Sequence, residues 1–337
     1  MKKLLSILII SLAFASCSND VEVEQPNGDP TAIEFGDVST RVGVNDILEF
    51  GVYASVKAAD APTNVPLLIN EKVSRPTAMD YFDYENTKYW IPNATHNFFA
   101  YYPYAVVGGD VSAAEALADN NGFKLTFTTP DGADCDLLTA HHSVLTGNDT
   151  SAQGPVAIDF DHALVNLNLN IWRDNAKHQN DKIRVKAVRL SNVAWSGTLT
   201  KTAESATWEY TSKEAINKVF DPAVEIGAAV LTGNVLEPGP SAVPAKPFGD
   251  GGLLVIPQPA GTITLRVVYE LWLKGAADTE WNEYFIEINL PAATWTAGSR
   301  VTYNVLLSNI VDIAFYYIST SITPWGTPQV GGTIIIK

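Results

Sequence analysis

The chain has 337 residues, of which 46% are apolar, and a formal net charge of −15. Its length allows two domains with ample cores, and its acidity argues against nucleic-acid binding, which needs a basic face. Thirteen Tyr, thirteen Phe and eight Trp residues, with abundant Val, Thr and Ile, favour strands over helices. We therefore expect a mainly β, secreted protein.

Residues 1–16 have the pattern of a secretory signal peptide. Lys2 and Lys3 precede a short apolar run that ends in small residues before Cys17. The run is shorter than the roughly 20 residues that a spanning helix needs. Its ending, FASC, resembles the lipobox of bacterial lipoproteins, in which the cysteine is lipidated and becomes the mature N-terminus. We expect Cys17 to carry the lipid, palmitate included, and to anchor the exported chain in the outer membrane.

Residues 17–41 are interpreted as a lipidated tether followed by a removable first strand. Residues 18–30 are polar, acidic and turn-rich, which is typical of a flexible linker. From Thr31 to Ile47, apolar residues recur at period two and predict a strand. Arg41 lies within it, and a trypsin-like cut there would remove the tether with half of the strand. The groove left behind is one that another chain's strand can fill.

Residues 42–155 are predicted to form an N-terminal β-sandwich. Its most aromatic segment, KYWIPNATHNFFAYYPY at 88–104, alternates Phe98 and Ala100 with Phe99 and Tyr101, which predicts a strand buried on both faces. Residues 146–155, TGNDTSAQGP, are interpreted as the linker between the domains. Further strands are expected at 48–56, 65–73 and 123–129, with a helical turn near 113–118.

Residues 156–337 are predicted to form a C-terminal β-sandwich with a donor-strand tail. In VNLNLNI, from Val165, three Asn residues alternate with Leu and Ile, which predicts a half-buried strand with a polar face outward. The tail from Val330 to Lys337 is an apolar strand with nothing after it to pair with, an aggregation risk unless a partner takes it. Other strands are expected at 183–193, 206–210, 253–256, 262–273, 281–290, 300–307 and 310–317, with a helical turn near 214–219.

Six segments together resemble the fimbrillin-like proteins of Bacteroidales, the subunits of lipoprotein-derived (type V) pili. They are the lipobox, the first strand with its arginine, KYWIPNATHNFFAYYPY, DFDHALVNLNLNI, RVTYNVLLSNI and ITPW. The resemblance rests on the order and spacing of these segments, and it spans nearly the whole chain. The resemblance implies two tandem transthyretin-like, Greek-key β-sandwich domains, exported as a lipoprotein and cut by an arginine-specific protease in or after the first strand.

The resemblance also implies how subunits join. A neighbouring subunit's strand, usually from the C-terminal tail in stalk subunits, fills the groove that the cut opens. Arg41 would be the processing position, and Val330, Ile334, Ile335 and Ile336 would belong to the donor strand. The chain has both features, so we expect a stalk subunit in a homo- or heteropolymer at the cell surface. It would support adhesion to a host or bacterial surface ligand, without enzymatic activity, metal or cofactor.

Two groups of polar residues could have a chemical role. Cys135, His141 and His142 could be soft metal ligands, but adjacent histidines on a strand point to opposite faces and the spacing matches no closed zinc pattern. With Cys17 lipidated, Cys135 also has no partner for an internal disulfide. His162, near Asp159 and Asp161, suggests an acid–base pair, but no nucleophile elbow accompanies it. We expect a capped strand edge there.

Two acidic patterns are also interpreted structurally. Glu283 and Glu287 share a strand face and lie about 13 Å apart, which is too far for a pair of glycosidase carboxylates. The DGADCD segment at 131–136 lacks the spacing of a calcium loop and is read as a turn.

The alternative function is a monomeric, glycan-binding or adhesin lipoprotein of the tip or anchor type. Exposed tryptophans could stack on sugar rings, although such residues more often fill a sandwich core. The processed N-terminus distinguishes the two readings, because a glycan binder would keep Cys17 and a polymerising subunit would start at Val42. The tryptophans concerned are Trp172, Trp195, Trp208, Trp272, Trp281 and Trp295.

Overall fold

The structure is a computed structural model that describes residues 30–40, 47–76, 82–104, 111–129, 136–175, 180–232, 235–277, 279–307, 316–325 and 334–335. Within these ranges the chain folds into β-strands and one short 3-10 helix, η1 (Ala260–Thr262), arranged around three sheets. The prediction of a mainly β protein is confirmed. No helix in the described part of the chain is long and apolar enough to cross a membrane.

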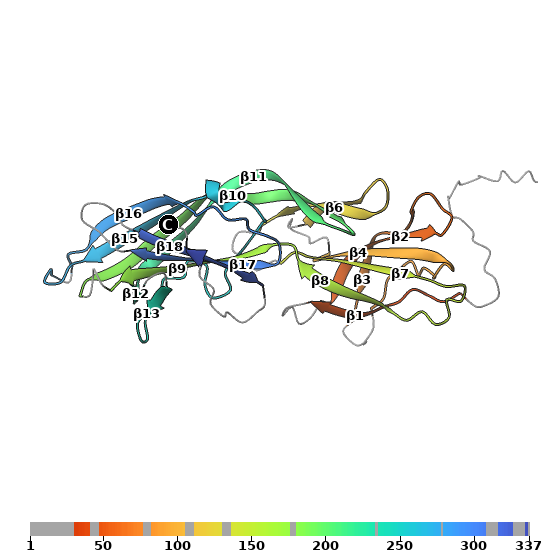
Figure 1. Ribbon diagram of the computed structural model, residues 1–337, viewed down its shortest axis with the longest axis horizontal. Coiled ribbons are helices and arrows are strands. Elements are labelled where there is room, and N and C mark those ends of the chain that lie inside the picture. The colour runs from red at the N-terminus through yellow and green to blue at the C-terminus, as the bar shows by residue number, and fades with distance from the viewer. Residues whose placement is uncertain are drawn as a thin grey trace, which may run out of the picture.

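The first sheet lies in one half of the molecule, at the right of Figure 1, with the strand order β1-β8-β7-β4-β2-β3. Its neighbours are antiparallel, except that β1 runs parallel to β8. The edge strand β1 is therefore brought to β8 from far away in the sequence. The strands are β1 (Phe35–Thr40), β2 (Glu49–Ala58), β3 (Val65–Ser74), β4 (Ala94–Tyr102), β7 (Leu138–Leu145) and β8 (Val156–His162).

The second sheet links the two halves of the molecule through one long strand. Its order is β16-β15-β10-β6-β5, with β11 also paired to β10. The 21 residues of β10 pair with β15 near one end and with β6 near the other, along the top of Figure 1. The strands are β5 (Val111–Ala116), β6 (Gly122–Thr128), β10 (Lys182–Thr202), β11 (Ala206–Glu225), β15 (Thr264–Trp272) and β16 (Asn282–Asn289).

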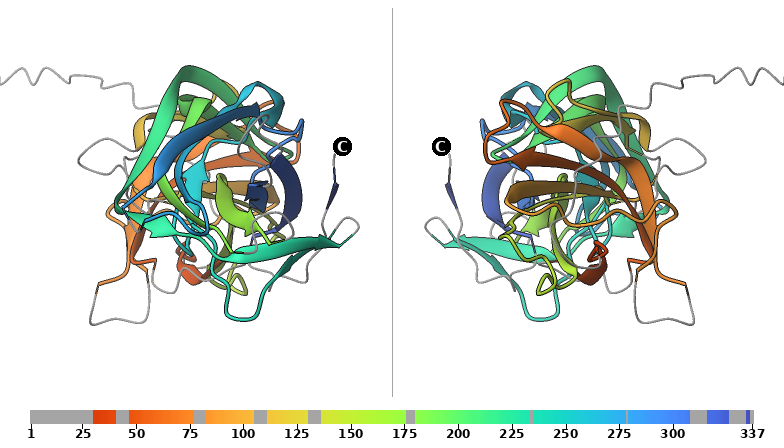
Figure 2. Two further views of the ribbon diagram at one scale, coloured as in Figure 1. Left: turned by 90° about the vertical axis from the view of Figure 1, so that its left-hand side faces the viewer. Right: turned by 90° about the vertical axis from the view of Figure 1, so that its right-hand side faces the viewer.

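The third sheet faces the second in the other half of the molecule. Its order is β13-β12-β9-β17-β18-β19, and β14 pairs with β9. The last strand, β19, lies at the outer flank beyond β18 (Figure 2). The strands are β9 (Val165–Asp174), β12 (Ala228–Thr232), β13 (Val235–Pro238), β14 (Leu253–Val255), β17 (Ser299–Leu307), β18 (Tyr316–Pro324) and β19 (Ile334–Ile335).

Three large apolar clusters hold these sheets together. One fills the space between the second and third sheets, and another packs on one face of the first sheet. The third lies where the first sheet meets β6 and β10. Strand β4 contributes Phe98 and Ala100 to the second of these clusters and Phe99 and Tyr101 to the third. The prediction that this segment is buried on both faces is confirmed.

Some local predictions are wrong. The helical turns expected near 113–118 and 214–219 lie largely in β5 and β11, because pairing with β6 and β10 outweighs their weak helical preference.

Residues 146–155 connect β7 to β8 within one sheet. Two strands that precede residue 155 also pair with strands that follow it, because β6 pairs with β10 and β7 pairs with β8. The division into two domains stays a prediction.

Candidate functional site

The segment that contains β1 lies between two other parts of the chain. At its start, the Ile33 amide donates to the Lys88 carbonyl (2.8 Å) and the Trp90 amide donates to the Thr31 carbonyl (3.0 Å). Further on, Phe35 to Thr40 pair in parallel with Val156 to Phe160, with an irregular step between Phe35 and Val38. One side of the segment thus contacts residues 82–90, and the other side contacts β8.

Two side chains anchor this segment in the core of the first sheet. Ile33 and Phe35 are each only 1% exposed. The Phe35 ring makes edge contacts with Phe50, Phe98 and Tyr84 at centroid distances of 6.0, 5.9 and 5.6 Å. Burial of side chains of this size contributes about 1.5–3 kcal/mol each. The segment is therefore part of the hydrophobic core, although it lies at the edge of the sheet.

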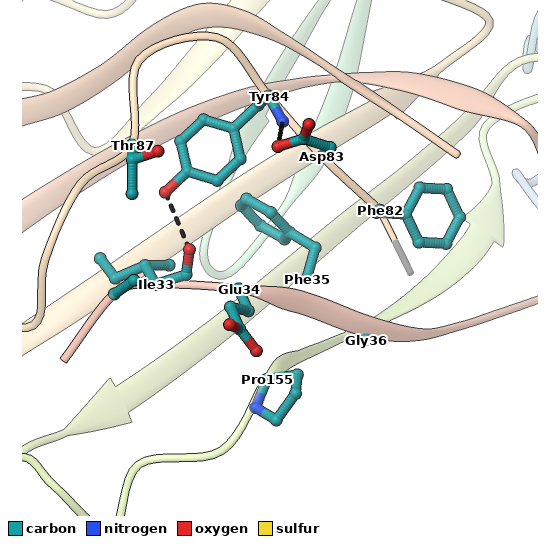
Figure 3. Close-up of a pocket in the computed structure, with 10 residues that line it drawn as sticks. Ile33, Glu34, Phe35, Gly36, Phe82, Asp83, Tyr84, Thr87 and Pro155 are labelled. Atoms are coloured by element: carbon teal, nitrogen blue, oxygen red, sulfur yellow. Dashed lines mark hydrogen bonds between the residues drawn. The ribbon is translucent and has the colours of Figure 1, made fainter. Parts of the chain in front are cut away.

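The phenol of Tyr84 fixes the backbone of the segment. Its hydroxyl donates a hydrogen bond to the Ile33 carbonyl (2.9 Å) and accepts one from the Lys88 amide (3.0 Å). Figure 3 shows this ring beside Ile33 and Phe35. Burial raises the pKa of Tyr84, and the hydrogen bond from Lys88 opposes that shift. The hydroxyl thus keeps its proton at neutral pH and stays a donor to Ile33.

A cavity of about 450 Å³ lies beside the segment and is shown in Figure 3. The segment forms one side of it, from Ala32 to Gly36, and Phe82, Tyr84 and Pro155 belong to the other side. The fit is nevertheless tight at Gly36, where a Cβ atom would lie 2.7 Å from the Pro155 Cβ. The segment therefore occupies a groove that it does not completely fill. We call this groove, lined by Phe50, Phe82, Tyr84, Phe98, Pro155 and the edge of β8, the β1 groove.

The pairing of β8 makes the groove depend on β1. On its other side, β8 pairs with β7 only at His162 with Leu138 and at Asp161 with Thr139. Without β1, the backbone from Val156 to Phe160 would lose its ladder partner, and the aromatic floor of the groove would meet solvent. Exposed backbone and apolar surface of this kind recruit a strand from another chain.

Most of the predicted site residues lie outside the described residues. Cys17, Arg41, Val330 and Ile336 are among them. Strand β1 ends at Thr40, the residue before Arg41.

The described part of the C-terminal tail is the short strand β19. Ile334 and Ile335 pair with Thr320 and Ser319 of β18 at the edge of the third sheet. In this structure the tail thus adds to a strand of its own chain.

Of the suggested metal ligands, the structure describes His141 and His142. Among the residues that the structure describes, no group of three His, Cys, Asp or Glu side chains could hold a metal ion. Cys135 lies outside the described residues. His141 stacks on Phe99 at 4.8 Å, and His142 lies opposite Phe98 in the ladder.

His162 has a different acidic partner from the two that the sequence suggested. Its Nδ1 lies 2.5 Å from the Asp136 carboxylate, and its ring stacks on Trp325 at 3.7 Å. Burial raises the pKa of Asp136, and the hydrogen bond with His162 opposes that shift. Two of the resembling segments, DFDHAL and ITPW, therefore meet in a packed contact, in keeping with a structural role.

Glu283 and Glu287 have the surface role expected of them. Glu283 pairs with Lys186 at 2.6 Å, and Glu287 lies 3.6 Å from Arg266. Each carboxylate is more than half exposed.

The six tryptophans do not form one platform. Trp295 is 1% exposed and donates to the Tyr303 hydroxyl, while Trp172 is 6% exposed in a separate small cluster. Trp208 borders the cluster between the first sheet and β10. Lys182 lies over Trp272 and Arg184 lies over Trp281.

Sequence reasoning missed the segment at 82–90, which forms one wall of the β1 groove. Its aromatic residues, in FDYENTKYW, were the available signal. Their partner, however, lies some fifty positions earlier in the chain.

The comparison with protein-family models identifies a family. The fimbrillin-like family model matches residues 40–325. A fimbrial protein from Bacteroides vulgatus has a TM-score of 0.62 at 17% identity, covering 87% of this chain and 99% of that one. At such identity the likeness shows the fold. No curated protein sequence gives a match.

Two further solved structures are more distant. A putative cell adhesion protein from Parabacteroides distasonis has a TM-score of 0.49 at 10% identity, and one from Bacteroides uniformis has 0.47 at 17%. Each match covers 89% of this chain and 100% of the other.

Proposed function

The chain belongs to the fimbrillin-like family, and from this premise we propose that it is a pilus subunit that polymerises by strand exchange after cleavage at Arg41. The observation that carries the proposal is the position of β1 in the fold. The strand is anchored in the core by Phe35, lies at the edge of its sheet and ends one residue before Arg41. A cut at that position would separate the strand from the body of the fold.

In the exchange, the donor strand replaces the contacts of β1 by contacts of the same kind. The side chains of Ile33 and Phe35 pack into the β1 groove, and the backbone from Phe35 to Thr40 pairs with β8. In a donor tail, Ile334 and Ile336 share one face at period two. They can therefore take the same places, each contributing about 1.5–3 kcal/mol through burial.

Cleavage gives the exchange its direction. While β1 is covalently attached, its effective concentration at the groove is high, so a separate strand competes poorly. Once the peptide bond after Arg41 is cut, β1 can diffuse away and the neighbour's tail remains. Removal of an inserted strand requires the core to open, so the polymer is kinetically durable.

The position of the tail supports a stalk role. Among the described residues of the tail, β19 adds to β18 through two residue pairs, and few of these described contacts must be broken before the tail can reach another subunit. With an acceptor groove and a donor tail, the subunit can continue a chain at both ends. Lipidation at Cys17 and passage through the outer membrane precede processing in this proposal.

The test is the N-terminus of the assembled protein. Fimbriae sheared from cells should contain this chain beginning at Val42, and the Arg41→Lys variant should accumulate as a lipidated monomer in the presence of an arginine-specific protease. Arg75→Lys is the matched control and should polymerise normally. Polymers that keep an acylated Cys17 would contradict the proposal.

A further inference from the structure

The outer face of the third sheet carries an ordered group of polar side chains. Asn166, Asn168 and Asn170 of β9 lie directly beside Arg300, Thr302 and Asn304 of β17 in the parallel register. The side-chain amide of Asn168 donates to Oδ1 of Asn166 (2.5 Å), and the side-chain amide of Asn170 donates to Oδ1 of Asn304 (2.9 Å). The side chains are thus held in place by one another.

A loop covers one end of this face. The Asn166 amide donates to the Gly251 carbonyl (2.6 Å), and Asn166 is only 2% exposed. Gly252 lies so close that a Cβ atom there would be 2.5 Å from the Asn166 side-chain oxygen. All three asparagines lie on the outer face, as expected, but Asn166 is buried there because the 246–252 loop folds over it.

The loop and the sheet border an open cavity of about 200 Å³. It is lined by Asn168, Asn170, Lys246, Gly249, Asp250, Arg300 and Thr302. Asn168 and Asn170 each use one N–H in the bonds above, so the amide oxygen and second N–H of each can serve a ligand. The lining thus offers hydroxyl, amide and cationic groups.

Two buried polar atoms, one on a residue that lines the cavity and one on its ladder neighbour, have no hydrogen-bond partner among the described residues. They are Nε of Arg300 and Oγ1 of Thr323. The two residues lie opposite each other in the β17–β18 ladder. Buried polar groups in native proteins are almost always paired, by protein or by water, so each of these atoms leaves a hydrogen bond to be made by a water or a ligand atom.

The charges of the cavity favour an anion. Lys246 and Arg300 line it, in a chain whose net charge is −15. The only carboxylate in the lining, Asp250, is bound to Lys246 at 2.6 Å and its side chain is 90% exposed. A guanidinium group matches a carboxylate in a paired, charge-assisted contact.

We propose that this cavity binds an acidic monosaccharide. The sugar carboxylate contacts the guanidinium of Arg300 and the ammonium of Lys246, and its ring hydroxyls bond the amides of Asn168 and Asn170 and the hydroxyl of Thr302. The volume suits a single sugar unit, such as the end of an acidic glycan. The proposal is independent of strand exchange, because the site lies on the third sheet and is complete in one chain.

Calorimetric titration of the full chain tests this site, with galacturonate, galactose and N-acetylglycine as separate titrants. Galacturonate should bind, and galactose should bind at least about tenfold more weakly because it lacks the charged group. N-acetylglycine should also bind more weakly, since it lacks the hydroxyls. Added salt should weaken galacturonate binding.

Two variants locate the site. Arg300→Gln should weaken galacturonate binding about tenfold or more, and Lys246→Gln, at an exposed position that folding tolerates, should weaken it as well. Arg189→Gln removes an exposed charge from β10 and should leave binding unchanged. Absence of galacturonate binding, or equal binding by wild type and both site variants, would show that only water fills the cavity. Equal binding of galactose or N-acetylglycine would overturn the assignment to an acidic sugar.

Discussion

The hydroxyl of Tyr84 donates a hydrogen bond to the carbonyl oxygen of Ile33 at 2.9 Å. This bond joins the wall of the β1 groove to the strand that fills it. Tyr84 also accepts a bond from the Lys88 amide, so the strand and the wall are held by one side chain.

The Tyr84→Phe substitution should loosen β1 without disturbing the rest of the fold. It leaves the Ile33 carbonyl and the Lys88 amide without their partner, which costs about 1–3 kcal/mol. Denaturant unfolding should show this loss, and cleavage at Arg41 should become faster. Tyr89→Phe, at a 45% exposed position, is the control. Equal stability and equal cleavage in both variants would show that Tyr84 does not hold β1.

The Phe35→Ala substitution should distinguish the precursor from the polymer. Phe35 is buried against three rings, so its removal should destabilise the uncut protein by about 3–5 kcal/mol. The cut and assembled form lacks Phe35, so the thermal stability of its polymer should be unchanged. Phe285→Ala, at a 57% exposed position, should affect neither form. A less stable polymer would mean that β1 stays in place after cleavage.

Acidification should destabilise the fold around His96, whose ring packs against Trp90 at a centroid distance of 4.9 Å. Burial lowers the pKa of His96 to about 4, and its Nε2 accepts a hydrogen bond from the Ile91 amide (3.1 Å). Between pH 6.5 and about 4 the unfolded chain binds a proton that the folded chain does not. His96 therefore opposes folding progressively as the pH falls through this window, by up to about 3 kcal/mol.

Unfolding experiments between pH 7 and pH 4 would measure this effect. In His96→Gln the part of the pH dependence that comes from this side chain should disappear, whereas His142→Gln should keep it. An unchanged slope in His96→Gln would assign the pH dependence to other groups.

Deletion of residues 326–337 should stop chain growth but preserve the fold. In the described structure the tail contributes only the two residue pairs of β19, so thermal unfolding should shift by only a few degrees. The cut protein without its tail should still accept a donor strand, and should therefore end filaments when mixed with wild type. Filaments of normal length in that mixture would argue against the tail as donor.

The sequence predicts strands better than it predicts their neighbours. The alternation of Phe98 and Ala100 with Phe99 and Tyr101 specified both faces of β4 correctly, because side chains alternate across a strand whatever it pairs with. The parallel pairing of β1 with β8 was not predicted, because nothing local in either strand marks a partner over a hundred positions away.

Loop composition carries even less information about connectivity. Residues 146–155 have the Gly, Asn, Asp and Pro content of an interdomain linker, and the same content suits the connection between β7 and β8. The groove partners Phe35 and Tyr84 are 49 positions apart in the sequence. Period-two alternation identifies Phe35 as buried, but only tertiary packing brings it to Tyr84.

The length of β10 has a mechanical consequence. This strand pairs with β15 over Lys182–Ser191 and with β6 over Ser196–Thr202, and it runs along the long axis of the molecule in Figure 1. A pulling force along that axis acts parallel to its ladders and loads many hydrogen bonds at once in shear. Along β10, tension is then carried from the part that pairs with β15 to the part that pairs with β6 by one continuous strand.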